Sequence, residues 1–153
     1  MKIRNAKLED YSELVEMYKS LIDTVYEGFE KGEDIFFHGS VQGWFQDKKD
    51  IIICETDDGI IAGFSLSFIE DLGFLKPYLY GDILFVKESF RKGRTAHLLY
   101  NNVVNYADQI GLPLIAKAYI GNGGEDKVDK IQSKFGSPLF KEFVRTKATN
   151  ENM

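Results

Sequence analysis

Three basic side chains lie within four positions of each other at the start of an expected helix. They belong to Arg91, Lys92 and Arg94, with Gly93 among them, and the apolar run 83–86 precedes them. The first amides of a helix have no partner inside the helix, and the helix dipole favours negative charge there. In a chain of net charge −5, this strand–turn–helix predicts a site for a polyphosphate. A solvated basic turn is the alternative.

The composition is that of one globular domain spanning 1–153, with a polar tail from about 147 that should fray. Hydrophobic residues make up 44% of the chain, which argues against wholesale disorder. The one cysteine, Cys54, lies in an apolar run, so a core position and a reducing compartment are expected, and the cytoplasm is the predicted location.

The same composition restricts the partners. No apolar run is long enough to span a membrane, so no membrane partner is predicted. A pI near 5.1 argues against nucleic acid as a partner and suits a cationic acceptor. Cysteine, histidine and aspartate form no cluster with metal-ligand spacing, so no metal is predicted.

Apolar periodicity and turn residues predict ten elements, with an Asp-Asp-Gly hairpin turn at 57–59. The expected strands are 2–6, 51–56, 60–69, 78–86, 114–120 and 139–146, and the expected helices are 9–25, 35–46, 94–110 and 125–135. Hairpins come first and a β-α-β crossover follows. The predicted fold class is therefore α/β, with a central mixed sheet and helices on both faces.

This order, with the basic turn after the third long strand, resembles the GNAT superfamily of acyl-CoA-dependent N-acyltransferases over roughly residues 3–145. Members of that superfamily carry a turn of the form Arg/Gln-x-x-Gly-x-Gly/Ala whose amides hold the pyrophosphate of coenzyme A. The six positions are filled here by Arg91, Lys92, Gly93, Arg94, Thr95 and Ala96. The first and last positions fit. The fourth is Arg94 where glycine is usual, and a glycine stands one place earlier.

The resemblance implies acetyl-CoA as cosubstrate. It assigns the backbone of Leu84, Phe85 and Val86 to the pantetheine arm, with amides near Phe85 polarising the thioester carbonyl. Asn122 is the candidate for a further contact with the cofactor arm. An asparagine between glycines is also a common turn residue, so both interpretations of Asn122 remain open.

The resemblance also implies the catalytic residues. Many members place an acid on the strand before the phosphate turn, and Asp82 stands at that place, where it could take a proton from the acceptor amine through water. A solvated or salt-bridged carboxylate at the end of the strand is the alternative. Tyr80, two residues earlier on the same strand face, could line the same cleft. The superfamily's usual thiolate-protonating tyrosine is replaced by Gln132, and no tyrosine follows Tyr119.

The implied function is an N-acetyltransferase that moves an acetyl group to a primary amine of a small molecule or a protein by direct attack. A fold that binds the cofactor without turnover is the first alternative, and an interaction protein with no nucleotide ligand is the second. His38 is a candidate acceptor contact, and four loop acids could attract a polycation: Glu33, Asp34, Glu70 and Asp71. The acceptor stays open, and so does assembly into a homodimer.

Overall fold

The computed structural model describes residues 1–25, 32–47, 49–70, 73, 75–117, 130 and 134. Its strands are β1 (Lys2–Asn5), β2 (Asp50–Thr56), β3 (Gly59–Ile69), β4 (Tyr78–Val86) and β5 (Leu114–Ala116). Its helices are α1 (Tyr11–Val25), α2 (Asp34–Gln46) and α3 (Thr95–Ile110), with single turns η1 (Leu8–Asp10) and η2 (Glu88–Phe90). Apart from residues 130 and 134, the helix expected at 125–135 falls outside the described ranges, and so does the strand expected at 139–146.

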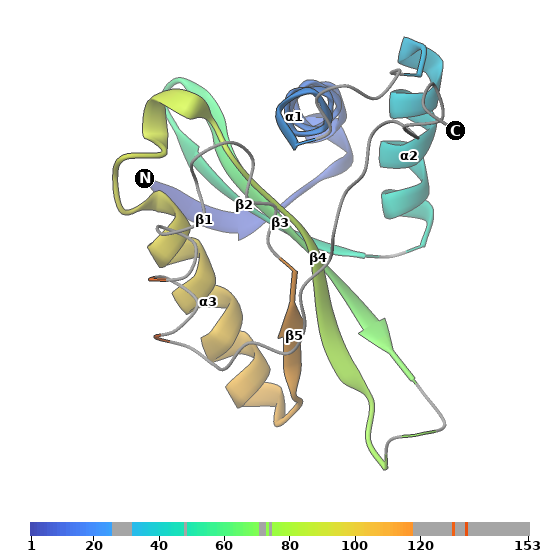
Figure 1. Ribbon diagram of the computed structural model, residues 1–153, viewed down its shortest axis with the longest axis vertical. Helices are drawn as coiled ribbons and strands as arrows, with labels where there is room; N and C mark the ends of the chain where they lie inside the picture. The colour runs from blue at the N-terminus through green and yellow to red at the C-terminus, as the bar shows by residue number, and fades with distance from the viewer. Residues whose placement is uncertain are drawn as a thin grey trace, which may run out of the picture.

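The five strands form one mixed sheet in the order β1-β2-β3-β4-β5 (Figure 1). The pairs β1–β2, β2–β3 and β3–β4 are antiparallel, and β5 runs parallel to β4. A parallel pair needs a crossover connection, which α3 supplies. The predicted mixed sheet is therefore confirmed. The strand expected at 114–120 is described as β5 only to Ala116.

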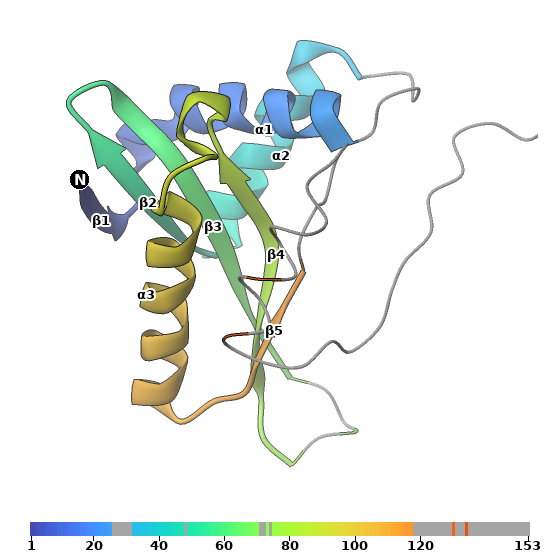
Figure 2. The ribbon, with the colours of Figure 1, turned by 60° about the vertical axis from the view of Figure 1, so that its left-hand side comes forward.

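The helices cover both faces of the sheet (Figures 1 and 2). On one face α1 and α2 pack against a buried apolar cluster that includes Val15, Val41, Ile53 and Phe85. On the other face α3 packs through Leu99 and Val103, against strand residues such as Phe64 and Leu66. Alternate strand residues point to opposite faces, so β2 and β3, which are buried on both sides, read as nearly continuous apolar runs.

Two glycines are required by local geometry. Gly111 ends α3 in the left-handed conformation with φ of 71°, as its position after the last apolar residue predicts. Gly81 lies in β4 directly against the Phe64 ring, and a Cβ added there would stand 2.8 Å from Cζ of that ring. Gly81 thus lets the ring of Phe64 lie against the backbone of β4. Within the described ranges, no helix is both long and apolar enough to cross a membrane.

Candidate functional site

A β-bulge in β4 puts Asp82 beside the helices. Ser65 of β3 faces Ile83, whereas the next residue, Leu66, faces Gly81, so Asp82 is the extra residue of the bulge. A bulge interrupts the alternation of side chains and re-aims one of them. As a result Asp82 and Ile83, although consecutive, both line the same pocket on the α1 and α2 side of the sheet.

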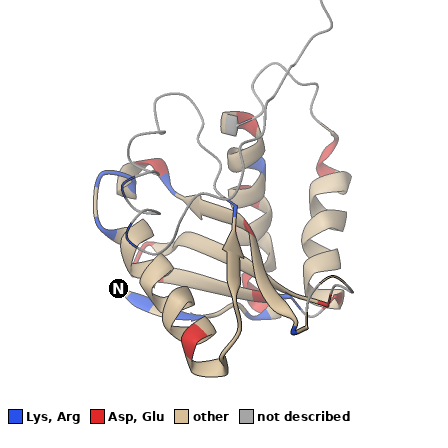
Figure 3. Ribbon diagram, turned by 60° about the horizontal axis from the view of Figure 1, so that its bottom comes forward, with Lys and Arg blue, Asp and Glu red and all other residues tan. Residues whose placement is uncertain are grey.

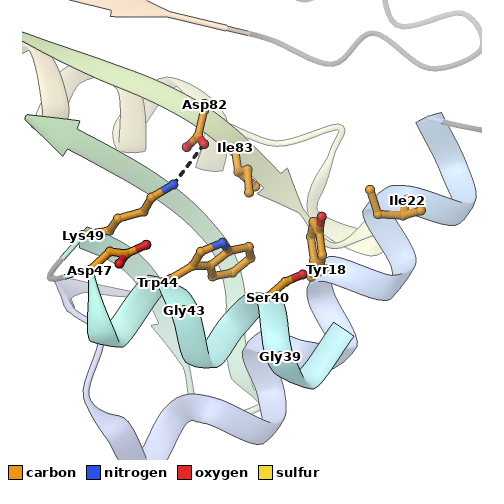
Figure 4. Close-up of a pocket in the computed structure, with 10 residues that line it drawn as sticks. All are labelled: Tyr18, Ile22, Gly39, Ser40, Gly43, Trp44, Asp47, Lys49, Asp82 and Ile83. Atoms are coloured by element: carbon orange, nitrogen blue, oxygen red, sulfur yellow. Dashed lines mark hydrogen bonds and ion pairs between the residues drawn. The ribbon is translucent and has the colours of Figure 1, made fainter. Parts of the chain in front are cut away.

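Two donors hold the Asp82 carboxylate. The buried Ser65 hydroxyl donates to Oδ1, and the Lys49 ammonium lies 3.3 Å from Oδ2 (Figure 4). Both charged side chains are about one-quarter exposed, at 22% for Lys49 and 25% for Asp82. Lys49 stands in the short connection from α2 to β2, where its amide donates to the Trp44 carbonyl at 3.1 Å. The carboxylate is thereby fixed from two separate elements.

The sequence did not reveal the role of Lys49. It lies in the run Asp47-Lys48-Lys49-Asp50, which has the composition of an ordinary charged loop. Its partner is 33 positions away in the chain, and only the sheet brings the two together. The salt-bridged alternative for Asp82 is therefore what the structure contains, and it is compatible with a role in proton transfer because the pair lies at a pocket.

The pocket beside this pair has a volume of about 560 Å³ and lies between α1, α2 and β4. Charged side chains gather at one end and aromatic or aliphatic ones extend toward the other (Figure 4). The charged members are Asp47, Lys49 and Asp82, and the apolar and aromatic members are Tyr18, Ile22, Trp44 and Ile83. Ser40 and two glycines of α2 complete the described lining. The arrangement suits a ligand with one charged end and an apolar body.

Tyr80 stands apart from that pocket. It faces Ser67 of β3 and Ile115 of β5, is partly buried, and is not among the described residues that line the pocket. The expectation that Tyr80 lines a cleft together with Asp82 is therefore untested. A catalytic role for Tyr80 stays a prediction.

The outer edge of β4 changes its pairing at Gly81. The ladder with β5 ends at Gly81 and Ala116, and the Lys117 amide donates to the Gly81 carbonyl at 2.7 Å. Leu84, Phe85 and Val86, predicted to meet a pantetheine arm, pair with β3 on their other edge. In the part of the chain that the structure describes, β5 does not extend alongside them. That geometry is compatible with a ligand on this edge, and the contact stays a prediction.

The basic turn forms where the sequence predicted it, between the end of β4 and the start of α3. Lys92, Gly93 and Arg94 are exposed, and Figure 3 shows the basic residues of this connection in blue. Arg94 is the N-cap of α3 and its side chain makes no capping hydrogen bond. Thr95 is buried and Ala96 partly buried. The helix start thus combines exposed positive charge with amides that α3 itself does not use.

Arg91 has a structural contact that the sequence did not reveal. Its Nε donates to the Val86 carbonyl at 2.8 Å, and its guanidinium carbon lies 5.9 Å from the centre of the Phe85 ring. One of its five N–H donors is therefore used to secure the end of β4. The predicted contacts of the turn with phosphates remain predictions for all six residues 91–96.

The remaining candidate residues either contact other residues of the protein or lie outside the described part of the chain. The Tyr11 hydroxyl donates to the His38 carbonyl at 2.8 Å. The ring nitrogen Nδ1 of His38 lies 3.0 Å from the Tyr11 hydroxyl oxygen. Asp34 forms an ion pair with Lys19 at 2.7 Å, which joins α2 to α1. Asn122 and Gln132 lie outside the described residues, so their predicted places are untested.

No protein-family model matches the chain, and no curated protein matches it by sequence. Solved structures do match. A possible acetyltransferase from Clostridium difficile superimposes with a TM-score of 0.75 at 11% identity, covering 94% of this chain and 96% of that one. A predicted acetyltransferase from Clostridium acetobutylicum, crystallised with acetyl-CoA, superimposes with a TM-score of 0.69 at 20% identity, covering 94% of both chains.

An aminoglycoside antibiotic 6'-N-acetyltransferase from Acinetobacter haemolyticus also matches, with a TM-score of 0.65 at 14% identity over 97% of this chain and 99% of that one. Each of these similarities extends over nearly the whole of both chains. Identities this low establish the fold, and activity belongs to the site. The chain therefore has the fold of these acetyltransferases.

Proposed function

We propose that this protein is an N-acetyltransferase that moves the acetyl group of acetyl-CoA to a primary amine by direct attack. The observation that supports it most is the bulge at Asp82, which presents a carboxylate to a pocket from β4, the strand that leads into the basic helix start. The fold similarity to a protein crystallised with acetyl-CoA supports the same cosubstrate.

The cofactor would bind along β4 and the turn that follows. Lys92, Arg94 and the first amides of α3 supply donors and positive charge for the two bridging phosphates. The edge of β4 near Phe85, beyond the described end of the ladder with β5, would take the pantetheine arm and direct an amide at the thioester oxygen. Such preorganised donors stabilise the negative charge that develops on that oxygen.

The reaction needs a neutral amine at the thioester carbon. The acceptor ammonium gives up one proton, directly or through water, toward Asp82, whose orientation Ser65 and Lys49 fix. A nitrogen–carbon bond forms as the carbon–sulfur bond breaks, and the thiolate of coenzyme A leaves with the bonding electron pair. The nitrogen gives its second proton to solvent as the neutral amide forms. The thiolate then takes a proton from solvent, because the superfamily's tyrosine is replaced by Gln132.

The test combines binding with turnover. Acetyl-CoA should raise the melting temperature of the protein, and a panel of primary amines should release free thiol from acetyl-CoA in its presence. Unrelated nucleotides at the same concentration serve as the control for the thermal shift. An unchanged melting temperature together with no thiol release from any amine would count against the proposal.

One observation favours a second candidate, a module that binds acetyl-CoA without turnover. That observation is the missing tyrosine after Tyr119. Stabilisation by acetyl-CoA without thiol release over a broad amine panel would support this candidate. Thiol release that depends on Asp82 would exclude it.

A further inference from the structure

We infer that the pocket beside Asp82 selects primary amines that carry one positive charge and an apolar body, and that Lys49 sets this selection. The inference rests on the proposed transfer to an amine and names the class of acceptor for the same site. It depends on the charges and the side chains that line the described part of the pocket, in three steps.

The first step is the charge of the pocket. Two carboxylates, Asp47 and Asp82, and one ammonium, Lys49, give the described lining a charge of −1. Lys49 already pairs with Asp82 at 3.3 Å, whereas no ion pair to Asp47 occurs among the described residues. A single incoming ammonium therefore brings the lining to neutrality. A second ammonium would find no further uncompensated carboxylate among the described residues of the lining.

The second step is the opposite end of the pocket. Trp44 and Tyr18 meet edge to face, with ring centres 5.0 Å apart, and Ile22 lies beyond them (Figure 4). Ser40 lines the same wall, but its hydroxyl donates to the Phe36 carbonyl of its own helix at 3.0 Å. An alkyl or aryl group removes its apolar surface from water here, whereas a charged group would lose hydration and find no carboxylate in the described lining of this end.

The third step concerns the acids that could attract a polycation. Glu33, Asp34 and Glu70 are not among the residues that line the pocket. Asp34 is already paired with Lys19 at 2.7 Å. These three acids therefore do not extend the negative charge of the pocket toward a second ammonium, and Asp71 lies outside the described residues.

Binding can be followed without any turnover, because Trp44 is the one tryptophan of the chain and lines the pocket. The full-length protein is titrated with hexylamine and with hexamethylenediamine, which has the same chain length and a second ammonium. Tryptophan fluorescence reports the dissociation constant of each amine. Hexylamine should bind more tightly than the diamine by about tenfold, equivalent to about 1.4 kcal/mol.

Lys49→Met tests the cause of the selection. It removes the ammonium and leaves two uncompensated carboxylates, so the preference for hexylamine should fall by about fivefold or reverse. Lys2→Met removes the same charge from the exposed start of β1 and should leave the preference unchanged. Asp47→Asn is a second variant of the pocket, and it should weaken hexylamine binding in a protein that keeps the pair between Lys49 and Asp82.

Equal affinities for the two amines, tighter binding of the diamine, or no binding of either would overturn the inference. An unchanged preference in Lys49→Met would overturn it too. These outcomes are separate from failure of the proposed function. A protein without thiol release can still prefer hexylamine in the fluorescence titration, whereas an active enzyme that prefers diamines would overturn only the selection.

Discussion

The carboxylate of Asp82 is the side chain on which the proposed proton transfer depends. Asp82→Asn keeps the size of the side chain and one oxygen acceptor, but it removes the negative charge that receives the proton. Turnover should fall by about 100-fold, in the range of general-base contributions. Acetyl-CoA affinity should stay within about twofold, because the phosphate turn is a separate contact. Thiol release measures the first quantity and the thermal shift with acetyl-CoA the second.

Asp108→Asn, at an exposed position near the end of α3, is the matched control for Asp82→Asn and should change neither quantity. If Asp82→Asn reduced turnover and acetyl-CoA binding equally, its effect would be on the fold or the cofactor site. The role as a base would then be wrong.

Gly81 gives a prediction about stability at the same scale. In Gly81→Ala the new Cβ would press on the Phe64 ring, which also meets Tyr100 edge to face with centres 5.2 Å apart. The ring cannot withdraw without disturbing that contact, so the free energy of unfolding should fall by about 1–3 kcal/mol. Denaturant titration measures it.

Gly63→Ala is the matched control for Gly81→Ala, since it adds the same methyl group to the adjacent strand. There the nearest atom would be the flexible end of Met17, at an ordinary 3.5 Å. The control should therefore cost clearly less stability. Equal losses from the two substitutions would show that the backbone effect of glycine replacement, rather than the Phe64 ring, decides the result.

At the scale of elements, the connection from β4 to α3 contains two kinds of basic residue. Arg91 supports the end of β4, whereas Lys92 and Arg94 are exposed. Replacing Lys92 and Arg94 together with alanine should weaken acetyl-CoA binding by about tenfold or more, since each removes a charge-assisted contact. The melting temperature of the free protein should hardly change. Calorimetric titration measures the affinity for acetyl-CoA, and thermal unfolding without ligand measures the melting temperature.

Arg91→Ala is the contrasting variant for this connection. It removes the hydrogen bond to the Val86 carbonyl and the contact with the Phe85 ring, so it should lower the melting temperature without any ligand. If the double variant at Lys92 and Arg94 bound acetyl-CoA as tightly as the wild type, the helix start would not be the phosphate site.

The elements were predictable from sequence where the apolar pattern and the turn residues agreed. The strand expected at 78–86 matches β4, and Gly111 ends α3 as expected. The helix expected from residue 9 begins as the turn η1, with α1 starting at Tyr11. Such boundary differences arise because one terminal hydrogen bond decides between a tight turn and an α-helix.

The candidate site was less predictable than the elements. Asp82 was identified by its place before the basic turn, but the bulge that directs it into the pocket depends on the register of β3 against β4. A one-residue offset in pairing leaves no signal in the alternation of either strand alone. Lys49 and Ser65 were missed for the same reason, because tertiary pairing brings them to Asp82.

At the scale of the whole molecule, one guanidinium joins the first strand to two other elements. Arg4 of β1 donates to both carboxylate oxygens of Asp10 in η1, at 2.8 and 2.9 Å. It also donates to both oxygens of Glu55 in β2, at 2.9 Å each. These hydrogen bonds lower the pKa of Asp10 below its ordinary 3.8 and the pKa of Glu55 below its ordinary 4.5.

These shifts predict how acid affects stability. A carboxyl whose pKa is lower in the folded chain than in the unfolded chain stabilises the fold fully above its ordinary pKa, and that contribution disappears as the pH falls through the lowered value. The free energy of unfolding should therefore decrease as the pH falls below about 4.5, the ordinary pKa of Glu55. Denaturant titrations at a series of pH values measure the slope.

Arg4→Met tests whether this network causes the acid dependence. The variant should be less stable than the wild type at neutral pH, because it leaves the partly buried Asp10 carboxylate, with 11% of its side chain exposed, without its cation. Its stability should fall less steeply with acid, so the two curves should converge at low pH, where both carboxyls are protonated in either protein. Lys92→Met removes a charge at an exposed position and should follow the wild-type curve. Curves for Arg4→Met and wild type that stay parallel throughout would mean that other groups govern the acid response, and that Arg4 acts through packing alone.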